Sequence, residues 1–164
     1  MHLAAPCTLR PLSILEDAEA LFIDSAFELL LPEPTNACEA AALRASAFVD
    51  ERLRRAEECL VEIHVDDGLC DYRLSADQVL GAYRSGIEAV ANHCESSHGK
   101  AFHLLTTPQR HAVLGRLERG SASAGLARHG VLFALLLHHA AEAYFEAFNV
   151  CLRRRQQRLS SETA

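Results

Sequence analysis

Histidine and glutamate side chains lie close together in the sequence at His138, His139 and Glu142. On a helix, positions three or four apart share a face, so one histidine and the glutamate could bind a metal ion together. A carboxylate-bridged di-iron site would need Glu-x-x-His elements from two helices and two further carboxylates, and only one such helix is predicted. The pattern therefore favours a role in packing and hydrogen bonding over metal binding. Such a packing element could also lie at an interface.

A second group of polar and sulfur side chains consists of His93, Cys94 and His98. Adjacent His93 and Cys94 point in different directions on a helix, and no cysteine or histidine pair with zinc-site spacing follows. A cysteine that acts as a nucleophile needs a base such as histidine beside it in the fold. No pattern in the sequence pairs a cysteine with such a base, so nothing specific supports a thiol nucleophile. With no signal sequence visible, we expect reduced thiols at all six cysteines, Cys7, Cys38, Cys59, Cys70, Cys94 and Cys151.

Motifs that bind cofactors are missing from the sequence. It contains no Gly-x-Gly-x-x-Gly segment after a strand and no Walker loop. A flavin oxidoreductase cannot be assembled from this chain alone, so we predict no catalytic, cofactor-binding or metal-binding residues in it. The formal charge of −6 weighs against a general nucleic-acid binder, because affinity for a polyanion is built mainly from lysine and arginine.

Composition indicates what kind of fold positions these residues. The chain is 49% hydrophobic, chiefly alanine and leucine, with 6% aromatic residues and no tryptophan. Such a composition suits helices that pack closely across small residues. We therefore predict an all-α, compact single domain of about five helices over residues 1–164, with a flexible N-terminus at 1–11 and a polar C-terminal tail at 153–164.

Periodicity places the first two helices. The first carries Leu15, Ala18, Phe22, Ala26 and Leu29 on one face and must end at Pro32, because proline lacks the amide donor. The second carries apolar residues at three and four spacing from 42 to 63, with Glu51/Arg55 and Arg54/Glu58 on a solvated face. Residues 65–74 contain Asp66-Asp67-Gly68 and are predicted to form a loop.

Capping signals delimit the remaining helices. Ser75 and Gln78 have capping-box spacing at the start of the third helix, and Gly99 is its expected stop. The fourth opens at Thr107-Pro108 and closes near Gly120. The fifth runs from about residue 126 well past Phe148, and its charge pattern argues against a membrane span. Its predicted apolar face is Phe133, Leu137, Ala140, Tyr144, Phe148 and Cys151.

The stretch from Val79 to Gly120 also carries a recognisable pattern, with Tyr83-Arg84, Gly86, Cys94, Gly99-Lys100, Phe102, Gln109, Leu117-Glu118 and Gly120 in order. This arrangement resembles the middle of the gluconate 2-dehydrogenase subunit 3 family. Similar matches are Leu31-Pro32, Pro34 with Ala37, Phe48-Val49-Asp50, and Val131–Phe145 as the family's last helix. The likeness covers roughly residues 12 to 146, and none of its motifs is a catalytic signature.

The resemblance implies a function that this chain performs with a partner. Family members are small, cofactor-free partners of large FAD-dependent sugar and alcohol dehydrogenases of the glucose–methanol–choline type. The partner would carry FAD and oxidise a sugar, polyol or related alcohol, while this chain supports its folding, stability or translocation. Whether a cytochrome c subunit joins such a complex stays open.

Two features depart from the family pattern. Relatives usually begin with a twin-arginine export signal, whereas residues 1–13 have only Arg10 and no apolar segment of the needed length, so we expect a cytoplasmic complex. Relatives also commonly close with a Pro-Tyr-Gly-Gly-Asn element, which the sequence after Phe145 does not contain. The usual C-terminal contacts of the family are therefore in doubt here.

The last helix is the expected place of the partner interface. Its apolar residues cover more of the helix than one core stripe requires, and we predict an interface at Tyr144, Phe145, Phe148, His138 and His139. The competing interpretation is a central helix buried on all sides by its own chain. Two other functions stay open: a free-standing protein that binds a metal or small molecule through His138, His139 and Glu142 with His93 or His98, and a homo-oligomeric helical regulator.

Overall fold

The computed structural model describes residues 12–31, 45–55, 61–65, 70–119 and 129–162. Over this part of the chain it confirms the all-α class. Five α-helices occupy most of it, namely α1 (Asp17–Leu30), α3 (Ala45–Arg54), α4 (Ala76–His98), α5 (Thr107–Glu118) and α6 (Gly130–Glu162). A short 3-10 helix, η1 (Phe102–Leu104), joins α4 to α5. The predicted flexible N-terminus at 1–11 lies outside the described residues.

A two-stranded hairpin is the largest element that the sequence analysis missed. Strands β1 (Val61–Val65) and β2 (Cys70–Leu74) pair antiparallel, with Val61 opposite Leu74. The predicted second helix is therefore wrong at 61–63, and the predicted loop is wrong at Val65 and from Cys70 to Leu74. Residues 56–60 and 66–69 lie outside the described residues. The physical reason is that β-branched residues alternate with polar ones through β1, at a period of two that suits a strand.

Local signals placed the ends of α4 correctly. The amide of Gln78 donates to Ser75 Oγ at 3.4 Å, and the amide of Ser75 donates to Gln78 Oε1 at 2.9 Å. At the other end Gly99 has φ 61°, the left-handed conformation that glycine adopts without strain. The predicted stripe of this helix is buried throughout: Val79, Tyr83, Gly86, Val90 and Cys94. α5 likewise keeps Pro108 in its first turn, although its N-cap is Thr106.

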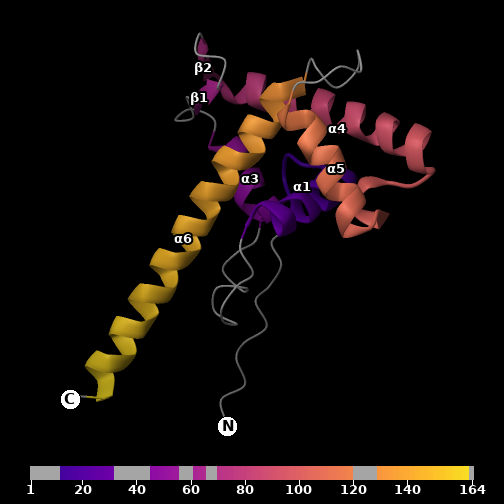
Figure 1. Ribbon diagram of the computed structural model, residues 1–164. Helices are drawn as coiled ribbons and strands as arrows, with labels where there is room; N and C mark the ends of the chain where they lie inside the picture. The colour runs from indigo at the N-terminus through magenta and orange to yellow at the C-terminus, as the bar shows by residue number, and fades with distance from the viewer. Residues whose placement is uncertain (1–11, 32–44, 56–60, 66–69, 120–128, 163–164) are drawn as a thin grey trace.

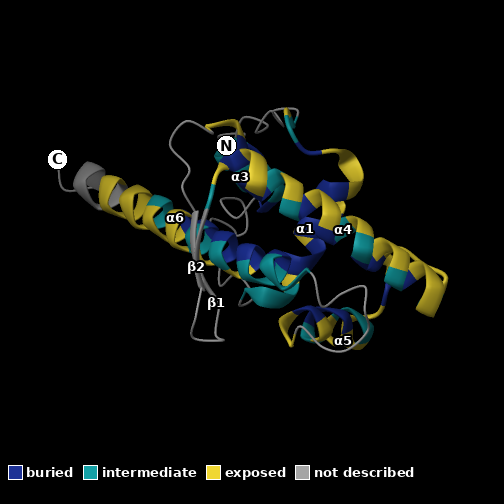
Figure 2. Cartoon of the chain, turned by 90° about the horizontal axis from the view of Figure 1, so that it is seen from above, coloured by how far each residue is buried: buried dark blue, intermediate teal, exposed yellow. Residues whose placement is uncertain are grey.

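The core lies where α1, α4, α5 and α6 meet, as the dark blue faces in Figure 2 show. α4 and α6 are in tight contact at Gly86, where an added methyl group would lie 2.6 Å from Leu132 Cδ2 and 2.8 Å from Leu132 Cβ. The absence of a side chain at Gly86 therefore sets the separation of the two longest helices.

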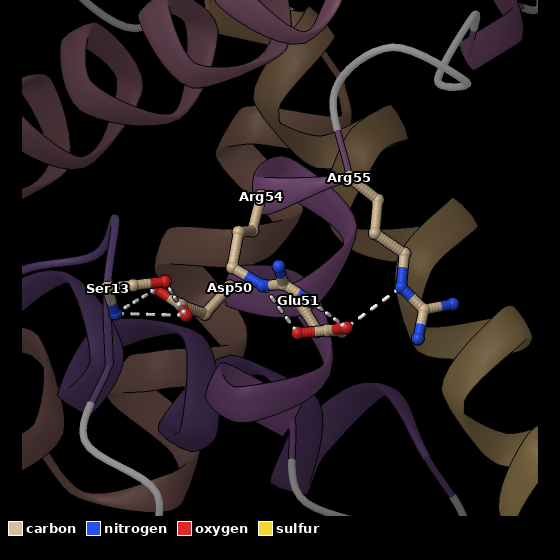
Figure 3. Close-up of polar contacts among 5 residues, drawn as sticks. All are labelled: Ser13, Asp50, Glu51, Arg54 and Arg55. Carbon is tan, nitrogen blue, oxygen red and sulfur yellow. Dashed lines mark hydrogen bonds and ion pairs between the residues drawn. The ribbon is translucent and has the colours of Figure 1, made fainter.

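A single carboxylate on α3 holds the segment that leads into α1. Asp50 accepts hydrogen bonds from the amide of Ser13 at 3.0 Å and from its hydroxyl at 2.9 Å (Figure 3). It also accepts from the amides of Ile14 at 2.7 Å and Leu15 at 2.9 Å. Burial alone would raise the pKa of Asp50, but these hydrogen bonds outweigh it and the pKa is lowered. We call this arrangement the Asp50 clasp.

The neighbouring residue Glu51 faces solvent and binds two arginines. Its carboxylate pairs with Arg54 at 2.6 Å and with Arg55 at 2.8 Å, as Figure 3 shows. The hydrogen bond from Arg54 is the main cause that lowers the pKa of Glu51 to about 2. The predicted Glu51/Arg55 pair is confirmed, whereas Glu58, the predicted partner of Arg54, lies outside the described residues.

α6 is the longest helix and extends well past the other elements toward the C-terminus (Figure 1). By length and composition alone, residues 130–157 would suffice to cross a membrane, which corrects the expectation that no run qualifies. The core helix of a folded domain can meet the same criteria. Here the N-terminal half of α6 packs into the core through Leu132, Leu135 and Leu136.

Candidate functional site on the last helix

The buried face of α6 differs from the predicted one. Of the predicted residues, Ala140 is fully buried, whereas Leu137 and Phe148 are exposed. The side chains that face the core are instead Leu132, Leu135, Leu136, His139, Ala140, Ala143 and Ala147. Because this helix is apolar around most of its circumference, periodicity could not decide which side faces inward.

The outer face of α6 carries large apolar side chains in solvent. Phe145 is 63% exposed, Phe148 43%, Leu137 49% and Leu152 41%. Tyr144 is partly buried, and its ring meets the ring of Phe145 edge to face, with centroids 6.1 Å apart. Three of the five predicted interface residues, Tyr144, Phe145 and Phe148, therefore lie together on α6. Exposed Phe145 and Phe148 do not fit a helix buried on all sides by its own chain.

The two predicted interface histidines separate. His138 is partly buried, whereas His139 is only 1% exposed and faces the core. The Tyr83 hydroxyl lies 2.8 Å from His139 Nδ1, and the two rings stack with centroids 5.8 Å apart. Burial, with smaller contributions from His138 and Arg52, lowers the pKa of His139 to about 3. His139 is thus a neutral core residue that joins α4 to α6, and it is not placed to contact a partner.

The contact between Tyr83 and His139 joins two uncharged groups. Burial raises the pKa of Tyr83, so its hydroxyl keeps its proton. The hydroxyl and His139 Nδ1 share a single hydrogen bond of 2.8 Å, in which either atom can be the donor. In both cases Nδ1 is engaged with Tyr83 and has no lone pair left for a metal ion.

His138, His139 and Glu142 have ligand atoms that all lie within 4.8 Å of one another. Zinc would need nitrogen and oxygen ligands about 3.4 Å apart, because tetrahedral bonds to it are about 2.0–2.1 Å long. Glu142 already faces a cation, with Arg52 Nε 3.6 Å from its carboxylate, and His138 Nε2 lies 3.8 Å from it. The cluster is therefore better described as a polar contact between α3 and α6 than as a metal site.

A zinc titration tests this description. We expect that 100 µM Zn²⁺ shifts the melting temperature of the purified chain by less than about 1 °C. A site with a dissociation constant near 1 µM would instead contribute about 2.7 kcal/mol, or roughly 5–10 °C for a chain of this size. A shift of that size that disappears in Glu142→Gln would restore the metal-binding alternative.

The second histidine group does not assemble into a site. His93 Nε2 lies 2.7 Å from Arg116 Nη1, and burial with the nearby Arg116 charge lowers the pKa of His93. Cys94 is fully buried, and burial raises the pKa of its thiol to about 11. A thiol of this kind is the opposite of an activated nucleophile. In the described part of the chain, His93, Cys94 and His98 do not form a metal-ligand group.

Two residues matter in ways that sequence reasoning did not foresee. Asp50 and Arg84 belong to short patterns noted in the sequence, and both reach the segment before α1. Arg84 donates to the backbone carbonyl of Ile14 at 3.4 Å and to Glu19 Oε1 at 3.3 Å. Asp50 on α3 accepts hydrogen bonds from the amides of this segment, and Arg84 on α4 donates to one of its carbonyls. The two helices together therefore hold the segment that precedes α1 in place.

Comparison with known proteins adds one match. A family model described as gluconate 2-dehydrogenase subunit 3 matches residues 17–147, a range that contains α1 through most of the buried half of α6. No curated protein and no solved structure matches the chain.

Proposed function

The chain belongs to the gluconate 2-dehydrogenase subunit 3 family, and from this premise we propose that it is a non-catalytic small subunit that binds and stabilises a large FAD-dependent oxidoreductase subunit. The large subunit would be of the glucose–methanol–choline type and would oxidise a sugar, polyol or related alcohol. FAD belongs to that subunit, because the present sequence has no dinucleotide-binding motif.

The observation that carries the proposal is the outer face of α6. Phe145 and Phe148 place aromatic rings in solvent beside Tyr144, on a helix whose other face is committed to the core. Aromatic residues are enriched at the centres of protein interfaces, where their burial provides much of the binding energy. We therefore assign the partner contact to Tyr144, Phe145 and Phe148, and not to buried His139.

Stabilisation of the partner follows from mass action. A subunit that binds only the folded large chain removes folded molecules from the unfolding equilibrium. The gain is about 2.7 kcal/mol when the free subunit is present at one hundred times its dissociation constant. The small subunit needs no chemistry of its own for this effect, which agrees with a fold built on packing.

Co-expression with the large flavoprotein subunit tests the proposal. We expect the wild-type chain to co-purify with a yellow, FAD-containing subunit, and the variant Tyr144→Gln, Phe145→Gln, Phe148→Gln to lose that subunit while keeping its helical circular dichroism. Removing three interface aromatics costs several kcal/mol, so the affinity should fall at least 100-fold. Leu21→Gln and Leu104→Gln are matched controls, because both replace exposed leucines elsewhere.

Each result of the co-purification experiment has a separate meaning. A triple variant that stays folded and still binds would move the contact away from α6. A triple variant that loses helical content would show that the three aromatics support this chain's own fold. A wild-type chain that never co-purifies with a flavoprotein would contradict the proposed function itself.

A further inference from the structure

A strip of apolar residues follows the outer face of α6 with the spacing of a coiled coil. Ala141, Phe145, Phe148 and Leu152 are separated by four, three and four positions, and all four are exposed. We call these four residues the outer seam. At about 100° per residue, the seam lies roughly opposite the side of α6 that faces the core. Spacing of this kind lets a helix pack against another helix through interlocking side chains.

The outer seam lies where a second helix can approach. Ala147 is the last buried residue of α6 among positions 130–157, where burial is described, and the helix continues to Glu162. Figure 1 shows this part of α6 extending away from α1, α4 and α5, and Figure 2 shows mostly exposed positions along it. A helix laid along the seam would therefore lie on the far side of α6 from the body of the protein.

We propose that the occupant of the outer seam in the free subunit is the same seam of a second copy, packed antiparallel. In this register Phe145 packs against Phe148 of the second copy, and Ala141 packs against Leu152 of the second copy. The two-fold axis repeats each contact, so four aromatic rings meet at the centre with small and large side chains matched on either side. The bodies of the two copies lie at opposite ends and on opposite faces of the helix pair.

Charge decides between the two possible directions. Arg153, Arg154 and Arg155 form a basic end on a chain whose formal charge is −6. A parallel pair would bring the two basic ends together. An antiparallel pair places Arg155 opposite His138 of the second copy and one turn from Glu142 of the second copy, and the Glu142 side chain is 36% exposed. Opposite charges at the flanks of a coiled coil set the direction in which its helices pair.

Self-pairing should be weak. Specific interfaces bury about 800 Å² per partner, which is more than the four seam side chains can supply without their neighbours. We therefore expect a monomer–dimer equilibrium with a dissociation constant on the order of 10–100 µM. Phe145 and Phe148 also belong to the proposed flavoprotein contact, so the second copy and the flavoprotein compete. The self-pairing does not depend on the flavoprotein and can be measured on this chain alone.

Sedimentation velocity between about 1 and 300 µM tests the self-pairing. We expect the wild-type chain to change from monomer to dimer over this range, and Phe148→Gln to stay monomeric, with at least tenfold weaker association. Leu104→Gln, which changes an exposed leucine outside α6, should dimerise like the wild type. A wild-type chain that is monomeric at 300 µM would overturn the proposal. Binding of that monomer to anionic vesicles would then identify a lipid surface as the occupant.

A charge exchange tests the antiparallel direction. Arg155→Glu and Glu142→Arg should each weaken dimerisation several-fold, because each places like charges across the pair. The double variant carries both changes in one chain and restores both ion pairs, so it should dimerise within about twofold of the wild type. Circular dichroism controls for loss of the Arg52–Glu142 contact. If both single variants weaken dimerisation and the double variant fails to restore it, the antiparallel pairing is wrong.

Discussion

Asp50→Ala should lower the free energy of unfolding by about 3–5 kcal/mol, which is a large part of the stability of a chain of this size. The variant removes the acceptor of four donors, the amides of Ser13, Ile14 and Leu15 and the Ser13 hydroxyl. The Leu15 hydrogen bond is buried and the others are part-buried. An amide that loses its acceptor in a buried place costs about 1–3 kcal/mol, and water can recover part of this loss at Ser13 and Ile14. Urea unfolding followed by circular dichroism measures the difference.

Two variants on the same helix sharpen this test. Asp50→Asn keeps the shape of the side chain, but its NH2 group replaces one of the two acceptor oxygens and faces the backbone amides, which are donors themselves. It should therefore recover less than half of the stability that Asp50→Ala loses. Glu51→Gln changes the adjacent, solvent-facing carboxylate and should cost less than about 0.5 kcal/mol. Equal effects of Asp50→Ala and Glu51→Gln would show that the Asp50 clasp adds nothing beyond a surface ion pair.

The clasp also fixes the sign of the response to acid. Because the folded pKa of Asp50 lies below its ordinary value of 3.8, its contribution is fully present above that value. It is lost as the pH falls through the lower, folded pKa. His139 changes the stability over a higher pH range. Its folded pKa of about 3 lies below its ordinary value of 6.5. Stability therefore begins to fall as the pH drops below about 6.5. In Asp50→Asn the loss of stability below about pH 4 should become smaller, because Glu51 still contributes there, whereas the loss that begins below about pH 6.5 should stay unchanged.

Gly86→Val should destabilise the protein by about 3 kcal/mol or more, because the new side chain has no room between α4 and α6. Even a methyl group would lie 2.6 Å from Leu132 Cδ2 and 2.8 Å from Leu132 Cβ, so the Leu132 side chain cannot simply rotate away. Overpacking of a core costs about 1–3 kcal/mol and sometimes more. Thermal unfolding should show a melting temperature lower by about 6–12 °C.

Gly81 is the matched control on the same helix. An added methyl group there meets nothing within 4 Å, so Gly81→Ala should stabilise the protein by about 0.5–1 kcal/mol through helix propensity. Leu132→Ala in the Gly86→Val background should recover part of the loss, because the two residues share one space. Additive effects of Gly86→Val and Leu132→Ala would contradict direct contact as the cause.

Predictions from the sequence held where the signal was local. Ser75, Gln78 and Gly99 act within one or two turns of a helix end, so their spacing alone placed α4. The hairpin was missed because Ile63 continues the three and four spacing predicted for the second helix, while it also fits the alternation of Val61, Ile63 and Val65 in a strand. Short apolar runs of this kind support either structure.

The site depended on contacts that no local pattern contains. Asp50 meets its partners across 35 to 37 positions, and Tyr83 meets His139 across 56. His139 was grouped with His138 because the two are adjacent, although neighbours on a helix point about 100° apart. One of them entered the core and the other stayed near the surface. Phe145 and Phe148, two of the residues predicted at the interface, are exposed, although the predicted apolar face had included Phe148. A helix with apolar residues all round has more of them than one core can accept, so periodicity alone could not divide them.

Because α6 continues well past Ala147, binding of a partner to this part of the helix is coupled to helix formation. Among the positions of that segment whose burial is described, none is fully buried, and an isolated helix of such length is only marginally stable in water. Its turns can therefore fray while the bundle stays intact. Any molecule that covers the segment must supply the ordering that the bundle does not. Substitutions that raise helix propensity on the uncovered side should then tighten binding without touching the partner.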